Sequence, residues 1–327
     1  MNPSRIVSSL LAIAGLAFCT AASAADQPQA AVPLKPITKK LTFIYVPKLV
    51  HPWYEEVKRG VEYGIQEVKK EGIDVEYIWD APPEADVDEE NRKIEAAISR
   101  KPDGLCVSCL DPATNAQMLD EALKAGLNVL TFNATGGPKY PFVGRNKDAE
   151  DGYLCGKYVA EKLGKKGNVA ILLGSLTAPE HQGRVQGFKK AMAECPNIKV
   201  VFEQPDNDNL EQAVSVTEGA LQAHPDLNAI LCCNASNPIG AARAVKNAGK
   251  AGKILIGGFD NLPETLDFVR DGTILCTMAQ RQWEIGYWTL RYLVAMNRGQ
   301  TIPQDHDTGC LLVTADTLKQ QAQTAAK

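Results

Sequence analysis

The sequence has few of the residues on which catalytic and metal sites depend. Its 327 residues include only four histidines, and none lies in an H-E-x-x-H or H-x-x-E-H pattern. No G-x-S-x-G elbow is present, because Gly174-Ser175-Leu176 lacks the second glycine. No two C-x-x-C pairs occur at zinc-binding spacing. We therefore expect a protein without catalysis, metal or cofactor.

Long apolar runs and basic clusters are also missing. The apolar run Ile6–Cys19 is too short to span a bilayer, and an A-x-A cleavage pattern follows it at 22–24. This predicts an export signal at 1–24, cleaved after Ala24, and a soluble protein in the periplasm. The net charge is −4 and no basic run is present, which argues against nucleic acid as a partner.

The chain is longer than one comfortable hydrophobic core, so two lobes are expected. Residues 25–40 contain three prolines and little apolar periodicity, which predicts a flexible lead-in. From Leu41 onward, strand and helix patterns alternate, and the series restarts near 146. Strands are expected at 41–46, 74–79, 104–110, 128–133 and 141–145, then at 168–173, 199–204, 229–233, 254–257, 273–278 and 310–313, with helices between them. Two such series predict two Rossmann-like α/β lobes with a cleft between them.

The first turn of this series lies at 47–52, between an apolar strand and a helix that begins at Trp53. It contains no glycine, so its backbone cannot wrap closely around a pyrophosphate. The turn and the helix start instead carry a cation, an imidazole and two aromatic rings, from Lys48, His51, Trp53 and Tyr54. Ligands of open α/β sheets bind at the carboxyl ends of the strands. The turn therefore predicts a site for a compact polar ligand.

Other polar side chains also follow predicted strands or begin the next helix. Planar polar groups that bind hydroxyls, together with aromatic faces, are typical of carbohydrate sites. The predicted ligand-binding residues are His51, Trp53, Tyr54, Asn133, Gln182, Asn234, Asp260 and Gln280. Weaker candidates are Lys48, Ser108, Asp111, His181 and Asp208. Helix capping and turn formation explain Ser108, Asp111 and Asp208 at least as well, and Arg184 is expected to pair internally.

Four motifs in this pattern resemble those of a known family. They are His51-Pro-Trp-Tyr54, the helix start Gln182-Gly-Arg-Val-Gln-Gly-Phe188, Gly257-Gly-Phe-Asp260, and the stretch from Gly272 to Gln280. Together they resemble the periplasmic sugar-binding proteins of ABC transporters, in the ribose/galactose-type branch of the type I fold. The resemblance implies two lobes, each a parallel sheet flanked by helices, joined by three hinge strands. The lobes would comprise 41–145 plus 281–309, and 146–280 plus 310–327.

The resemblance also implies a function and a binding mode. A small neutral sugar would bind between the lobes of a monomer, which would deliver it to a membrane permease. Trp53 and Tyr54 would sandwich the sugar ring. Ribose binders carry Asp-Arg where this chain has Asn133-Ala134, so D-ribose itself is less expected. One alternative is a periplasmic sensor that reports a sugar or furanosyl signal to a chemoreceptor or histidine kinase.

The cysteines leave two further questions open. Eight remain after removal of the signal, an even number that suggests disulfides in an exported protein. In the implied fold, Cys276 could bridge to Cys310, or Cys155 to Cys195. The C-x-x-C pair Cys106 and Cys109 is interpreted as buried small side chains. A metal site formed by His51, Cys109, His181 and Cys233 is a further alternative.

Overall fold

The computed structural model describes residues 33–325. The predicted export signal and its cleavage point lie outside the described residues, as does the first half of the lead-in. Residues 33–40 form neither helix nor strand, but they are anchored: the Lys35 N–H donates to the Arg298 carbonyl over 3.0 Å, and Ile37 packs against the first core. The described residues from Lys35 onward form one compact unit.

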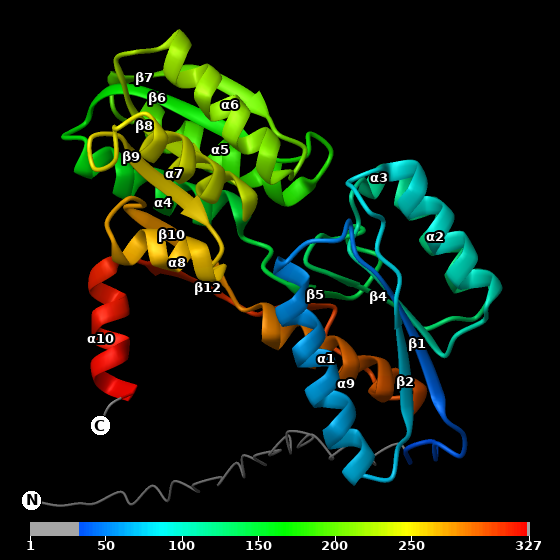
Figure 1. The fold of residues 1–327 in the computed structure, drawn as a ribbon. Coiled ribbons are helices and arrows are strands. Elements are labelled where there is room, and N and C mark those ends of the chain that lie inside the picture. The colour runs from blue at the N-terminus through cyan, green and yellow to red at the C-terminus, as the bar shows by residue number, and fades with distance from the viewer. Residues whose placement is uncertain (1–32, 326–327) are drawn as a thin grey trace, which may run out of the picture. The chain divides into compact units, whose positions relative to one another are not determined.

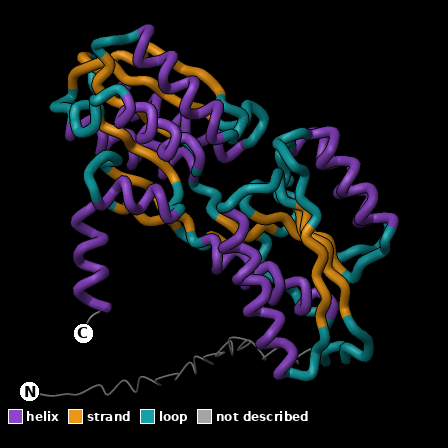
Figure 2. Tube along the Cα trace, in the orientation of Figure 1, coloured by secondary structure: helices purple, strands orange, loops and turns teal. Residues whose placement is uncertain are grey.

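The first lobe is built on a six-stranded sheet in which all neighbouring strands are parallel, in the order β11-β5-β4-β3-β1-β2. Its elements are β1 (Leu41–Val46), α1 (Trp53–Lys70), β2 (Val75–Trp79), α2 (Val87–Ser99), β3 (Gly104–Val107), α3 (Pro112–Lys124), β4 (Val129–Phe132), β5 (Phe142–Gly144), α9 (Gln282–Asn297) and β11 (Asp305–Asp307). Helices flank the sheet (Figure 2).

The second lobe is built on another six-stranded sheet, in the order β12-β10-β9-β8-β6-β7. Its elements are α4 (Asp148–Lys162), β6 (Lys166–Leu173), α5 (Pro179–Ala193), β7 (Asn197–Pro205), α6 (Leu210–Ala223), β8 (Leu227–Cys232), α7 (Ser236–Asn247), β9 (Leu255–Phe259), α8 (Pro263–Arg270), β10 (Cys276–Gln280), β12 (Cys310–Val313) and α10 (Ala315–Ala325). Only β12 runs antiparallel to its neighbour, β10.

The chain passes between the two sheets three times: from β5 to α4, from β10 to α9 and from β11 to β12. Figure 1 shows the consequence, because α9, coloured orange, packs beside α1, coloured blue, although most of the second lobe separates them in sequence. The predicted fold of two α/β lobes is therefore confirmed.

Glycines allow α1 and α9 to approach closely. A Cβ atom added at Gly60 would lie 2.0 Å from the Trp283 carbonyl oxygen, and one at Gly286 would lie 1.9 Å from that of Val57. The apolar stripe predicted for α1 faces the core, with Val57 and Val61 fully buried. The loop that follows β1 is thereby held between a buried strand and a firmly packed helix.

Two details of these elements differ from the sequence predictions. The strand predicted at 104–110 ends at Val107, so Cys109 lies beyond it. The short strand β11 was not predicted at all. Helix α2 begins at Val87, where the Asp86 side chain caps it by accepting the Glu89 N–H over 2.8 Å.

The suggested disulfides are absent. All eight cysteines of the described residues are free thiols, so neither Cys276 and Cys310 nor Cys155 and Cys195 are joined. Cys106 and Cys109 are both fully buried, and they pack into different hydrophobic clusters.

Candidate functional site

A small polar cavity of about 30 Å³ lies where residues from the two lobes meet. It is lined by Lys48, Leu49, His51, Trp53, Tyr54, Asn133, Glu180, His181, Arg184, Asp208, Asn234, Ala235, Asp260 and Gln280. The lining comes from the loops that follow β1, β4, β7, β8 and β9, the last residue of β10, and the first turns of α1 and α5. The cavity therefore lies at the carboxyl ends of the strands in both sheets, where open α/β folds bind ligands.

Three side-chain contacts join the lobes around this cavity. Lys48 Nζ donates to Glu180 Oε1. Trp53 Nε1 donates to Asp260 Oδ1 over 2.8 Å, and His51 Nε2 lies 2.9 Å from Ser236 Oγ. These three contacts define the closed arrangement of the lobes.

The tautomer of His51 follows from its second contact. Its Nδ1 accepts the backbone N–H of Trp53 over 3.1 Å, so the proton of the neutral ring is on Nε2. Nε2–H therefore donates to Ser236 Oγ. The Ser236 hydroxyl in turn donates to the Asp208 carbonyl over 3.4 Å.

The Lys48–Glu180 pair is almost completely removed from water, since each side chain is at most 4% exposed. Burial alone lowers the pKa of Lys48, but the neighbouring Glu180 carboxylate reverses this and raises it well above the usual range. Burial likewise opposes ionisation of Glu180, yet the Lys48 ammonium brings its pKa below the ordinary value. Both groups are therefore charged.

His181, in contrast to this pair, is uncharged. Burial, followed in importance by the Lys48 ammonium, lowers its pKa to about 4. Its Nδ1 accepts the Ser175 N–H over 3.0 Å, which fits a neutral ring. The cavity thus has an uncharged imidazole beside a buried ion pair.

A hydrogen-bonded chain supports the cavity on the first-lobe side. Tyr54 Oη lies 3.1 Å from Ser108 Oγ, and Asn133 Nδ2 donates to Tyr54 Oη over 3.2 Å. Asn133 has a φ of 60°, a left-handed conformation that asparagine tolerates better than most residues. Ser108 does not line the cavity but holds Tyr54 and Asn133 from behind.

Asp260 and Asn234 occupy the second-lobe side. Asp260, with a φ of 70°, accepts the Gln280 amide over 2.8 Å. Burial raises the pKa of Asp260. Asn234 accepts the Asn237 N–H over 2.8 Å and donates to Asp206 Oδ1 over 3.4 Å. Burial, and then the neighbouring Asp208, raises the pKa of Asp206 to about 8.

The chain was compared with known proteins. Residues 43–301 match the family described as "Periplasmic binding protein domain". The chain belongs to this family. The D-allose-binding periplasmic protein of Escherichia coli is 30% identical over 268 residues, which cover 79% of this chain and 85% of that protein. The D-ribose/D-allose-binding protein of Pseudomonas aeruginosa is 32% identical over 247 residues, or 71% of this chain and 76% of the relative.

Solved structures agree on the fold. An ABC transporter solute-binding protein of Burkholderia graminis in complex with D-arabinose aligns with a TM-score of 0.79 and 31% identity, covering 87% of this chain and 98% of that one. A solute-binding protein of Actinobacillus succinogenes with bound D-allose aligns with a TM-score of 0.78 and 28% identity, covering 86% of this chain and 100% of that one. The fold of this periplasmic binding protein is thus the two-lobed one that the sequence predicted.

Three of the predicted site residues do not line the cavity of this periplasmic binding protein: Ser108, as described above, Gln182 and Asp111. Gln182 is exposed and donates to the Leu176 carbonyl, which closes the loop before α5. Asp111 caps α3 by accepting the Ala113 N–H over 2.9 Å. Local backbone groups satisfy both side chains.

The predicted aromatic sandwich is also absent. The rings of Trp53 and Tyr54 meet edge to face, with an angle of 85° between their planes and 5.0 Å between their centroids. Two perpendicular rings in contact cannot cover opposite faces of a sugar.

Glu180, which is buried and lines the cavity, was not predicted from the sequence. An acid in the first turn of a helix that begins with Pro179 is already explained by the helix dipole, so its position carried no separate signal of a site. Arg184 pairs internally, as predicted, with Asp148 over 3.0 Å, and donates to the Cys233 carbonyl over 3.0 Å. It also lines the cavity.

The metal alternative finds no support in the geometry of residues 33–325. No three His, Cys, Asp or Glu side chains of these residues are grouped so that they could hold an ion. In the same part of the chain, no helix combines the length and the apolar character needed to cross a membrane.

Proposed function

We propose that this periplasmic binding protein captures a small neutral sugar between its lobes and delivers it to an ABC transporter permease. One observation carries the proposal: Glu180 Oε2 and Gln280 Oε1 are buried acceptors without a hydrogen-bond partner in the described structure, and both residues line the cavity. A buried acceptor left unpaired costs about 1–3 kcal/mol. Sugar hydroxyls are donors that would satisfy both atoms.

The charges of the lining residues favour a neutral ligand. Lys48 is matched by Glu180 and Arg184 by Asp148, so each described cation of the lining already has a carboxylate partner. His181 is neutral at physiological pH. A phosphate or carboxylate would therefore meet no unmatched positive charge.

The relatives support the same ligand class. Those from Escherichia coli and Pseudomonas aeruginosa are named for D-allose and D-ribose, and the Burkholderia graminis structure contains D-arabinose. All three are aldoses with several adjacent hydroxyls. The Burkholderia graminis structure is that of an ABC transporter solute-binding protein, which favours transport over the sensor role.

Capture requires movement of the lobes. A volume of about 30 Å³ accommodates only one or two water molecules, so a sugar enters when the lobes separate and Lys48 moves aside. A ligand bound to both lobes then favours the closed arrangement, which a permease distinguishes from the open one. Lys48, His51, Tyr54 and Asn133 would contact the ligand from the first lobe.

The second lobe would contribute Glu180, Asn234, Asp260 and Gln280. We further propose that the protein acts as a monomer in the periplasm, after cleavage behind Ala24, and that it has no catalytic activity.

A thermal-shift screen tests the proposal. The mature protein, refolded to remove carried-over ligand, is screened against pentoses, hexoses, sugar alcohols and furanosyl signals. A ligand at a hundred times its Kd adds about 2.7 kcal/mol of stability, which is readily visible. If no sugar or polyol raises Tm, the proposed ligand class is wrong.

Two matched variants locate the site of any sugar found. Gln280→Ala removes an unpaired acceptor, and we expect it to weaken binding about 5- to 100-fold. Gln182→Ala is the matched control. It removes a glutamine side chain that is exposed and lies outside the cavity, so it should leave the affinity unchanged. Equal affinities for the two variants would exclude Gln280 from the site.

A further inference from the structure

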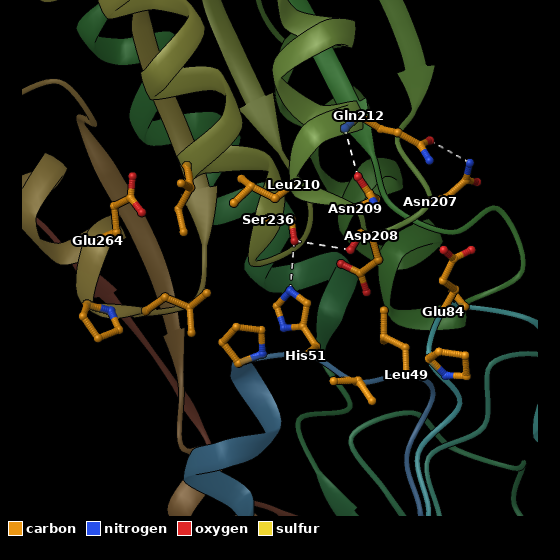
Figure 3. Close-up of a pocket in the computed structure, with 17 residues that line it drawn as sticks. Leu49, His51, Glu84, Asn207, Asp208, Asn209, Leu210, Gln212, Ser236 and Glu264 are labelled. Carbon is orange, nitrogen blue, oxygen red and sulfur yellow. Dashed lines mark hydrogen bonds between the residues drawn. The ribbon is translucent and has the colours of Figure 1, made fainter.

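A second and much larger pocket, of about 560 Å³, adjoins the small cavity (Figure 3). The loops around 49–52 and 83–85 line it on the first-lobe side, and the segments 207–212, 236–239 and 262–264 line it on the second-lobe side. We call it the outer pocket. It shares Leu49, His51 and Asp208 with the small cavity, so the two spaces are neighbours.

Two of the residues shared by the two spaces belong to a short hydrogen-bonded link. Figure 3 shows the link running from His51 to Ser236 and on to Asp208. The His51–Ser236 contact joins the lobes and opens when they separate. A ligand enclosed as the lobes close can therefore occupy both spaces.

The outer pocket differs from the cavity in its chemistry. Aliphatic side chains and prolines make up much of its lining, for example Val50, Leu210, Ile239 and Leu262. No Phe, Tyr or Trp lines it, so it lacks the large aromatic face on which a second sugar would stack.

Its charges are of one sign. No Lys or Arg is among the lining residues, whereas Glu84, Asp208 and Glu264 are. Arg243 binds Glu264 through two contacts of 2.7 Å, but Glu84 has no ion pair in the described structure. An anionic group would therefore be disfavoured in this pocket.

We propose that the physiological ligand is a glycoside, with its sugar in the small cavity and an aliphatic, non-anionic aglycone in the outer pocket. This inference rests on the proposed function and narrows its substrate class. The aglycone would bury apolar surface against Val50 and Ile239, and burial of this kind strengthens binding by several-fold for each methylene group.

Calorimetry with four ligands, of which the three glycosides are each used as two anomers, tests the inference. The best free sugar of the screen is compared with its propyl, 3-aminopropyl and 2-carboxyethyl glycosides, in both anomeric forms. We expect one anomer of the propyl glycoside to bind at least tenfold more tightly than the free sugar. The aminopropyl compound should bind at least as tightly as the propyl one, and the carboxyethyl compound more weakly than either.

A pair of variants tests whether the aglycone binds in the outer pocket. Val50 is 65% exposed and lines only the outer pocket, so Val50→Asp should fold normally, retain the affinity for the free sugar and lose the gain from the propyl group. Leu123→Asp, at an exposed leucine of α3 outside both spaces, is the control. It should change neither the affinity for the free sugar nor the gain from the propyl group.

Each outcome distinguishes this inference from the proposed function. Binding of the glycoside alone, or tighter binding that Val50→Asp abolishes, supports the outer pocket. If the free sugar binds and no glycoside binds more tightly, the inference is wrong and the proposed function stands. A gain that survives Val50→Asp also overturns the inference, and absence of binding by all four ligands overturns both.

Discussion

Trp53 of the first lobe donates a hydrogen bond of 2.8 Å to Asp260 of the second lobe, across 207 positions of the chain. Both side chains are buried, and the same Asp260 oxygen also accepts from Gln280. The indole therefore fastens the closed lobes together through its N–H group.

Asp260 is the acceptor on which this contact depends. We predict that Asp260→Ala weakens sugar binding about ten- to a hundred-fold, because a buried polar partner is lost at a cost of about 1–3 kcal/mol. Calorimetry with the best sugar measures the change. Trp53→Phe removes only the donor and keeps an aromatic ring, so it should have the smaller effect. An unchanged affinity of Asp260→Ala would remove Asp260 from the site.

The Lys48–Glu180 pair predicts a non-additive double-variant cycle. Lys48→Met leaves the Glu180 carboxylate buried and unpaired in the closed arrangement, at a cost of about 3–5 kcal/mol. The ligand-free variant should therefore be more open, with a larger radius of gyration in small-angle X-ray scattering.

The double variant Lys48→Met, Glu180→Leu removes both charges and should recover most of the compactness. If the double variant is as expanded as the single one, the ion pair does not hold the lobes together.

Glu90 predicts a pH dependence of stability. It is fully buried in α2, and its carboxyl accepts the Leu110 N–H over 3.1 Å. Burial raises its pKa from 4.5 to about 8. Between these values the folded chain keeps a proton that the unfolded chain releases, so the Glu90 contribution to stability falls as the pH rises from 4.5 to 8.

Glu90→Gln keeps an acceptor for Leu110 and removes the titration. Its free energy of unfolding should exceed that of the wild type at pH 8. It should also change less between pH 5 and 8 than that of the wild type, and the two changes should differ by roughly 1.4 kcal/mol for each unit of pKa shift. Urea unfolding at several pH values measures this. Glu95→Gln, at an exposed position of the same helix, is the control. Parallel pH profiles for the two variants would contradict the prediction.

The free cysteines predict a simple pattern of thiol reactivity. Seven of the eight described thiols are buried, and only Cys310 is partly exposed. In the native mature protein, a thiol reagent such as Ellman's should therefore modify at most one group, and Cys310→Ser should abolish that reaction. Burial raises the pKa of the Cys310 thiol, so this reaction should be slow. Fewer than eight reactive thiols in denaturant would reveal a disulfide.

Local signals allowed most of the fold to be predicted. The apolar run Leu41–Val46 forms a strand with the predicted bounds, because the apolar pattern of a strand core acts within a few residues. The strand Asp305–Asp307 has the sequence Asp-His-Asp and lacks such a signal. It exists because it pairs with Phe142–Gly144, a contact that only the tertiary structure creates.

The site was predictable to the extent that its residues follow strands. Asn133 and Asp260 directly follow β4 and β9, and the sequence placed both at the ligand. The sequence did not predict Glu180, because an acid in a first helical turn is already explained by the helix dipole. It also did not predict the angle between the rings of Trp53 and Tyr54. Trp53 is oriented by its hydrogen bond to Asp260, and Tyr54 by its contacts with Ser108 and Asn133. Such contacts between residues far apart in the chain leave no trace in the local sequence.

The packing of α9 against α1 also affects the order in which the two lobes can fold during synthesis. The core of the first lobe includes Ile285, Leu290 and Leu293 from α9, and β11 completes the edge of its sheet. A chain synthesised from its N-terminus therefore has every strand of the second lobe except β12 before the first lobe receives its last helix. The first lobe thus cannot complete its core until most of the second lobe has been made, which leaves its apolar strands open to chaperones during synthesis.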